Sequence, residues 1–156
     1  MQGNDAVVEM LNEVLTAELT AINQYFVDAR MCANWGYGRL AEHIRADSID
    51  EMRDAEALID RILFLEGIPN LQRLGTVRVG ENVPEKLQLA LDVERDAIAR
   101  LNRAVALATD SGDHGSRQVF EDILKGEEEH ADWLESQLEL IAQLGPQLYL
   151  AQQVGE

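Results

Sequence analysis

The sequence is poor in cysteine, proline, aromatic side chains and positively charged side chains. Its 156 residues include one cysteine, Cys32, and three prolines, and aromatic residues make up 5% of the chain. A single cysteine excludes an internal disulfide framework and fits the reducing cytosol. No apolar run reaches the ~18 residues that span a membrane, and the start, MQGNDAVVEM, lacks the basic and apolar regions of a signal peptide. We therefore expect a cytoplasmic protein with no membrane partner.

Positively charged side chains are few relative to negatively charged ones. Lys and Arg number 13 against 29 Asp and Glu, which gives a net charge of −16. Such a chain is repelled by nucleic acids and anionic membrane surfaces, so we expect no nucleic-acid partner and favour cations instead, either metal ions or basic proteins. Hydrophobic residues make up 46% of the chain, enough to bury a core, and the length fits one domain. We expect a single domain over residues 1–156.

Glycine and proline gather at a few positions, and the segments between them have a helical period. In the first segment, apolar residues such as Val7, Leu11 and Val14 recur three or four apart. Asn4 and Ser116 are expected N-caps, and Gly36 suits a left-handed C-terminal cap. The expected helices are approximately 5–34, 38–65, 83–110 and 116–144, followed by a short segment at 147–153.

The links between these helices predict their topology. The first and third links are short, which makes the joined helices antiparallel, whereas residues 69–82 have no helical period. A connection of that length can run along the bundle and start the third helix parallel to the second, as in ferritin-like proteins. We predict an all-α fold: a ferritin-like four-helix bundle with a long crossover between helices two and three and a short fifth C-terminal helix.

Each of the four long helices carries one glutamate within its apolar stripe. Glu18 has Leu11, Val14, Ile22 and Tyr25 four or seven residues away, and the other three positions have similar neighbours: Glu51 (least cleanly), Glu94 and Glu127. A lone buried carboxylate costs several kcal/mol unless a positive group neutralises it. Taken singly, each glutamate would more often lie at a helix edge with its carboxylate in solvent. Four such positions, one per helix, favour a shared buried site.

The acidic positions also repeat between the two halves of the chain. A spacing of 76 residues relates Glu18 to Glu94, Glu51 to Glu127 and Asp54 to His130. Each half thus reads Glu, then Glu-x-x-(Asp or His) 33 residues later, and residues three apart lie on one helix face. If the halves pack with approximate two-fold symmetry, six donors converge in the middle of the bundle: Glu18, Glu51, Asp54, Glu94, Glu127 and His130.

No lysine or arginine is placed to neutralise these donors. Arg53 points about 100° away from Glu51, and Arg61 lies two turns beyond Asp54. An oxygen-rich set with one imidazole suits Fe(II), Mn(II) or Zn(II), and Glu-x-x-His is typical of di-metal carboxylate bundles. The sequence therefore predicts two metal ions bridged by Glu51 and Glu127.

Several stretches resemble the bacterioferritin family, and the likeness covers essentially the whole chain. They are Leu19–Phe26 (LTAINQYF), Ser48–Met52 (SIDEM), Arg61–Gly67 (RILFLEG), Pro69–Asn70, Glu127–His130 (EEEH) and Asp132–Glu135 (DWLE). The resemblance implies a shell of 24 subunits, built from two-fold dimers, that oxidises Fe(II) at a di-iron site in each subunit and stores Fe(III) mineral inside. It also implies a b-type haem between paired subunits.

The resemblance assigns a role to each donor. Glu18 is implied as a terminal ligand of one iron and Glu94 with His130 of the other, with Glu51 and Glu127 bridging. Met52 matches the haem ligand. Without the resemblance, a helical methionine such as Met52 is usually core filler. Met52 lies about 100° from Glu51, in line with Ile49 and Ile59, on a second apolar stripe that a partner subunit can cover.

The chain departs from the family at the site itself, because Asp54 stands where the family has His. Aspartate has a shorter reach and adds a negative charge, which favours Fe(III) and lowers the reduction potential of the site. Ala46 and Gly126 also replace residues of an inner-surface iron site found in some members. The alternative to a ferroxidase is therefore a ferroxidase-impaired, haem-bearing structural subunit of a mixed shell with a second bacterioferritin subunit.

A third interpretation is a small dimeric di-metal redox enzyme of the rubrerythrin kind. It is weakened because the chain has no CxxC pair. For iron release, a ferredoxin or reductase is the expected partner. Tyr25 and Trp133 are read either as electron donors beside the ligands or as aromatic core residues, and Cys32 as a small packed side chain.

Overall fold

The computed structural model describes residues 1–155 and contains only helices and their connections within that range. The elements are α1 (Asp5–Asn34), α2 (Gly38–Phe64), α3 (Val83–Asp110), α4 (His114–Leu144) and the short α5 (Pro146–Ala151). The predicted all-α class is confirmed, with helix bounds close to those expected. None of the helices in residues 1–155 combines the length and apolarity needed to cross a membrane.

Short polar side chains fix where the helices begin. The Asn4 side chain accepts hydrogen bonds from the first turn of α1, and that of Asn82 accepts one from the Glu85 amide at the start of α3. At the other end of α1, Gly36 has φ 92°, the left-handed conformation that favours glycine.

The expectation that Ser116 caps the fourth helix is wrong. The N-cap of α4 is Asp113, whose carboxylate accepts from the Ser116 amide at 2.9 Å. The same carboxylate accepts from Arg61 of α2 at 2.8 Å. Because Asp113 is tied to both neighbours, α4 begins at His114, and Ser116 lies inside its first turn.

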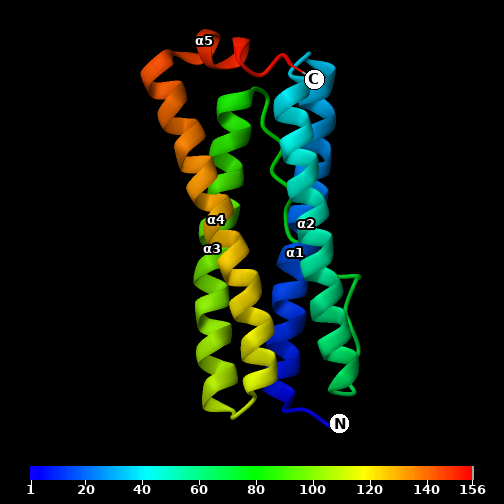
Figure 1. Ribbon diagram of the computed structural model, residues 1–156. Coiled ribbons are helices and arrows are strands. Elements are labelled where there is room, and N and C mark those ends of the chain that lie inside the picture. Colours follow the sequence, from blue (N-terminus) through cyan, green and yellow to red (C-terminus); the bar gives the residue numbers. More distant parts are fainter. Residues whose placement is uncertain (156) are drawn as a thin grey trace.

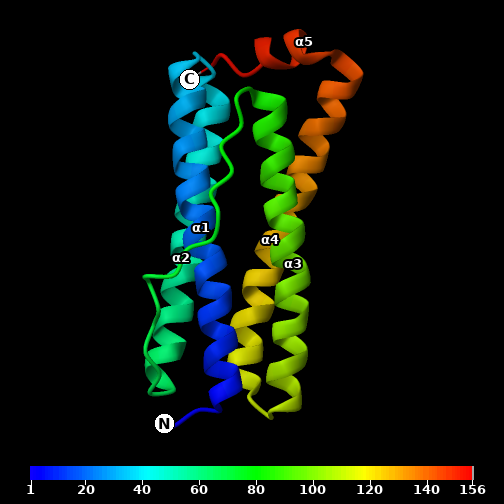
Figure 2. The ribbon, with the colours of Figure 1, turned by 180° about the vertical axis from the view of Figure 1, so that it is seen from behind.

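The bundle consists of two antiparallel hairpins, α1 with α2 and α3 with α4 (Figure 1). Residues 65–82 run from one end of the bundle to the other (Figure 2), so that α3 starts at the same end of the bundle as α2 and runs parallel to it, packed against α1 and α4. This confirms the predicted crossover. Three of its backbone amides donate to side chains of α1: Asn70 to Asn12, Gly75 to Thr20 and Arg78 to Gln24. The crossover is therefore attached along α1.

The short α5 lies across one end of the bundle (Figure 1). Its Tyr149 is buried and donates a hydrogen bond to Gln137 of α4 at 2.7 Å. Just beyond it, the Gln153 carbonyl accepts from the Arg39 amide at the start of α2. The C-terminal segment thus links α4 to the opposite hairpin.

The apolar core is divided into two clusters along the bundle. One, around Leu11, Leu58 and Phe120, fills the end near the N-terminus; the other, around Tyr25 and Leu87, fills the end near α5. Cys32 is fully buried in the second cluster, as expected of a packed side chain, and burial raises its pKa to about 11. The interval between the clusters is occupied by polar groups.

Candidate metal centre

Four buried glutamates occupy this interval, one from each long helix. Their side chains are almost inaccessible to solvent: Glu18, Glu51, Glu94 and Glu127 are 0–3% exposed. The apolar residues four and seven positions away turn each one inward, which is the position expected from the sequence. The alternative, a helix-edge carboxylate in solvent, does not describe any of the four.

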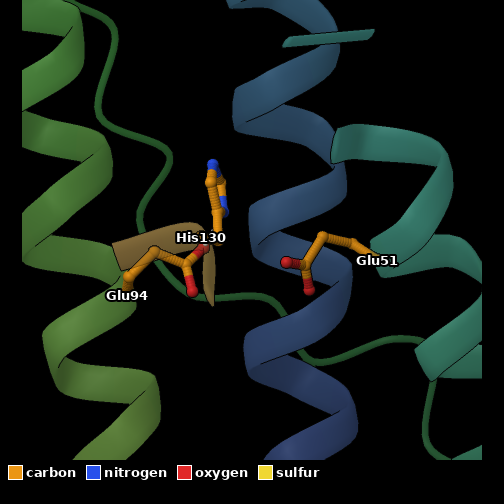
Figure 3. A group of neighbouring side chains, drawn as sticks. All are labelled: Glu51, Glu94 and His130. Carbon is orange, nitrogen blue, oxygen red and sulfur yellow. Dashed lines mark hydrogen bonds and ion pairs between the residues drawn. The ribbon is translucent and has the colours of Figure 1, made fainter. Parts of the chain in front are cut away.

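The donor atoms form two groups that share one residue. Atoms of Glu51, Glu94 and His130 lie within 4.8 Å of one another, as do atoms of Glu18, Glu51, Asp54 and Glu127. Figure 3 shows His130 beside Glu94, with Glu51 facing them from α2. Because Glu51 belongs to both groups, its carboxylate is placed to bridge two ions.

All six predicted donors are therefore in this one cluster. The Glu127 carboxyl falls in the second group only, although it shares hydrogen bonds with both Glu51 and Glu94. A bridging role for Glu127 remains a prediction.

Crowding of acids in a dry interior changes their protonation. Burial, reinforced by the Glu94 charge, raises the pKa of Glu51 to about 8. Burial and the charge of Asp50 raise the pKa of Asp54 to about 7, and burial with the Glu51 charge raises that of Glu127 well above its usual value. Without a cation, the cluster therefore retains protons near neutral pH.

In contrast, the pKa of Glu94 is lowered, because its carboxylate accepts several hydrogen bonds. Burial alone would raise its pKa, but bonds shared with Glu127, His130 and Tyr25 more than offset burial and lower it. The Tyr25 hydroxyl donates to Oε1 of Glu94, and the same oxygen lies 2.9 Å from Nδ1 of His130. Tyr25 is thus both a buried core residue and a direct partner of a predicted ligand.

His130 is held between two carboxylates from opposite sides of its ring. Nδ1 faces Glu94, and Nε2 lies 3.1 Å from Oδ2 of Asp47 on α2. Burial lowers the pKa of the imidazole, but these two carboxylates outweigh it and raise the pKa to about 10. In the absence of a metal ion, His130 is the positive charge of the cluster.

Other cations do not reach the centre, as the sequence predicted for two of them. Arg53 is exposed and pairs with Asp50, while Arg61 pairs with Asp113 at the far end of α2. The buried Lys86 pairs with Asp28, 2.9 Å away. Within residues 1–155, no Lys or Arg forms an ion pair with any of the six donors.

The centre also contains oxygen atoms that lack hydrogen-bond partners. One carboxylate oxygen each of Glu18, Glu51 and Glu94 is buried and unpaired. A buried acceptor without a donor costs roughly 1–3 kcal/mol, and more when it is charged. Three in one cluster, with an imidazole beside them, are a donor set that fits divalent cations with oxygen and nitrogen ligands.

Two openings lead to this centre. A pocket of 370 Å³ between α2 and α4 is lined by acids, among them Asp50, Asp54 and Glu129. A groove of 240 Å³ on the opposite face, between α1, α3 and the crossover, reaches Glu18 and Glu127 and is lined by Arg73, Arg78 and Arg100, referred to below as the arginine groove.

Sequence reasoning missed three features around the centre. It did not single out Asp47, which lies one turn before Glu51, and it missed the buried Lys86–Asp28 pair. It also gave no role to His43, whose partly exposed ring stacks on Trp133 with 3.7 Å between ring centroids. The spacing of His43, Asp47 and Glu51, four residues apart along one face, is a signal from which Asp47 could have been found.

Met52 lies away from the centre, on the outer face of α2. Its side chain is 52% exposed, and the neighbouring Ile49 is 39% exposed. An exposed thioether next to apolar side chains fits a haem held between two subunits, since one methionine supplies one axial ligand. The structure therefore agrees with a Met52 that is free to meet a group outside its own subunit.

A four-helix bundle with one long crossover and this donor set defines a ferritin-like protein, and the family model described as a ferritin-like domain matches residues 8–144. The chain is 50% identical over 152 residues to the bacterioferritin of Mycolicibacterium paratuberculosis, covering 97% of this chain and 96% of the relative. It is 54% identical over 151 residues to the bacterioferritin of Streptomyces coelicolor, covering 97% and 90% of the two chains. The chain belongs to the bacterioferritin family.

Proposed function

We propose that this chain stores iron by oxidising Fe(II) at the buried centre and depositing Fe(III) mineral inside a shell of 24 copies. The observation that carries the proposal is the set of unpaired, buried carboxylate oxygens of Glu18, Glu51 and Glu94 beside His130. Buried oxygens without hydrogen-bond donors do not stabilise the fold. As a substrate, Fe(II) would supply the positive charge that these oxygens lack.

The two groups of donors suggest a role for each residue toward two Fe(II) ions. Glu18 and Asp54 would bind one ion and Glu94 with His130 the other, with Glu51 and Glu127 between them. Because Glu51, Asp54 and Glu127 hold protons near neutral pH without metal, binding of Fe(II) displaces those protons. His130 must release its proton as well before Nδ1 can act as a ligand.

Oxidation then needs only geometry and charge from the protein. Each Fe(II) gives up one electron, and four of them reduce one O2 to the oxidation level of water, so that a two-iron centre completes the reaction in two rounds. Hydrolysis of the resulting Fe(III) forms oxyhydroxide and releases protons. The anionic donors favour Fe(III) over Fe(II), which promotes electron transfer to O2.

Asp54 supports the alternative function, in which this chain is a ferroxidase-impaired, haem-bearing subunit of a mixed shell. Its carboxyl belongs to the group with Glu18 and Glu51, and its pKa of about 7 leaves part of it protonated near neutral pH. In either case haem b would be held by Met52 of two subunits and would supply electron transfer, and a ferredoxin or reductase would deliver electrons for iron release.

Stopped-flow oxidation of two Fe(II) per metal-free subunit by O2 distinguishes these functions. We expect a fast phase in the wild type that Glu51→Ala abolishes and that Glu56→Ala, a change of an exposed glutamate on the same helix, leaves intact. A wild type as slow as Glu51→Ala, together with a fast Asp54→His, would instead establish the impaired subunit. Sedimentation separates a 24-subunit shell from a small dimer of the rubrerythrin kind.

A further inference from the structure

The two openings to the centre differ in charge. The pocket between α2 and α4 carries Asp47, Asp50 and Glu129 around the predicted ligands, and its one arginine, Arg53, is exposed and paired with Asp50. The arginine groove on the other face has a mixed lining: three arginines, the exposed acids Glu13 and Asp96, and the buried carboxyls of Glu18 and Glu127. In a chain with 29 acids and 13 bases, three arginines line that groove. A dication is attracted to the first opening, whereas at the second opening it also meets three guanidinium groups.

Two of the three guanidinium groups in the arginine groove lack an acidic partner. Arg100 is half-buried on α3, and within residues 1–155 it forms no ion pair; the same holds for Arg73 on the crossover. Arg73 is nevertheless fixed in direction, because its Nε donates to the Thr16 hydroxyl of α1 at 3.1 Å. Its remaining N–H groups are therefore available to a ligand.

The third arginine is only weakly neutralised. Nη2 of Arg78 lies 4.0 Å from Asp96, and both side chains are largely exposed, so the pair contributes little. The Arg78 backbone is held in place by the Gln24 side chain. Glu13, also at the groove, is exposed and unpaired in residues 1–155. Apart from the metal ligands, the groove thus carries three guanidinium groups against two carboxylates.

We propose that the arginine groove binds a tetrahedral oxyanion, inorganic phosphate, beside the metal centre. Guanidinium groups bind phosphate through two parallel N–H···O bonds, a geometry that an ammonium group does not offer. A volume of 240 Å³ admits a small ion and is below the size typical of drug-like ligands. The site goes beyond iron oxidation and does not depend on it, because no metal ligand is needed to hold the anion.

Equilibrium dialysis of metal-free protein against radiolabelled inorganic phosphate tests the site. We expect saturable binding of one phosphate per chain, competed by sulfate, and weakened about tenfold or more by Arg100→Gln and by Arg73→Gln. Arg103→Gln is the matched control, because Arg103 is an exposed arginine of the same helix that does not line the groove. Far-UV circular dichroism and particle size establish that each variant folds and assembles like the wild type.

Each other outcome overturns the proposal. Wild-type protein that shows no saturable binding has no phosphate site, and binding lost equally in Arg100→Gln and Arg103→Gln reflects overall charge alone. Adenosine monophosphate that competes more strongly than inorganic phosphate would assign the groove to an organic ester. Since the protein is free of metal throughout, these results are independent of whether it oxidises iron.

Discussion

Asp47 lies 3.1 Å from Nε2 of His130, on the side of the ring opposite Glu94. A carboxylate in this position keeps the Nε2 proton and leaves Nδ1 as the nitrogen that faces the centre. The Asp47 carboxylate also lies 3.5 Å from His43, whose ring stacks on Trp133. Asp47 thus connects a predicted metal ligand to the wall of the α2/α4 pocket, as a positioning residue.

Removing this carboxylate should weaken metal binding at one of the two positions. We expect Asp47→Asn to lower the affinity for the second Co(II) ion by about 10–100-fold, because His130 loses the group that fixes its orientation. Co(II) absorption titrations of metal-free protein measure this affinity. Asp47→Glu should recover part of the affinity. Asp60→Asn, which removes an exposed acid of the same helix that does not line the pocket, is the control, and equal effects at positions 47 and 60 would contradict the assignment.

The predictable part of the site is the part with a helical period. The four glutamates could be found because each sits among apolar residues four and seven positions away, and Asp54 and His130 because they follow a glutamate by three. The helix bounds follow glycine and proline for the same local reason. The N-cap of α4 was misplaced because Asp113 owes its position to Arg61, a residue 52 positions away.

Residues whose surroundings come from distant segments could not be predicted in the same way. Arg73 and Arg78 belong to the crossover, which has no period that would set it against α3. Lys86 lies in the first turn of α3, where a charged side chain ordinarily faces solvent, and only the packing of α1 against α3 buries it with Asp28. In each case the decisive neighbour lies more than 50 residues away in the sequence.

Glu51 should destabilise the metal-free protein. Its carboxyl is buried, shared between two groups of acids, and has one oxygen without a hydrogen-bond partner. We expect Glu51→Gln to raise the thermal midpoint of metal-free protein by several degrees while it abolishes the stabilisation that Zn(II) confers on the wild type. Glu56→Gln should change neither quantity. A lower midpoint for Glu51→Gln would mean that the carboxyl supports the fold.

The stability of metal-free protein should fall as the pH rises from about 6 to 9. The pKa of Glu51 is about 8 in the folded chain and that of His130 about 10, both above their ordinary values of 4.5 and 6.5. The folded state therefore holds more protons than the unfolded state through this range, and stability decreases with pH.

Thermal unfolding at several pH values, with a chelator and with Zn(II), measures this dependence. Glu51→Gln should reduce the slope of the chelated protein, since it removes one of the groups whose pKa is raised in the folded state. Bound Zn(II) should reverse the slope, because protons compete with the metal for the same donors. A midpoint of the chelated wild type that rises from pH 6 to 9 would contradict the proton uptake assigned to these residues.

Removing one member of the buried pair of Lys86 and Asp28 should lower the free energy of unfolding strongly, whereas replacing both with apolar residues should lower it little. Nζ of Lys86 lies 2.9 Å from Asp28, both side chains are almost fully buried, and the ammonium also faces the Trp35 ring at 5.5 Å. We expect Lys86→Met to destabilise metal-free protein by ~3–5 kcal/mol, because Asp28 is left charged and unpaired in the core. Urea unfolding at fixed protein concentration measures the change.

The double variant Lys86→Met with Asp28→Leu should recover most of that loss, since two apolar side chains of similar volume replace two charges that were both removed from water. A double variant as unstable as Lys86→Met alone would mean that Lys86 stabilises the fold through more than its ion pair with Asp28. The further contacts are with the Trp35 ring and with the backbone at Gly80. Neither side chain belongs to the metal centre, so both variants should bind two Co(II) ions per subunit wherever they remain folded.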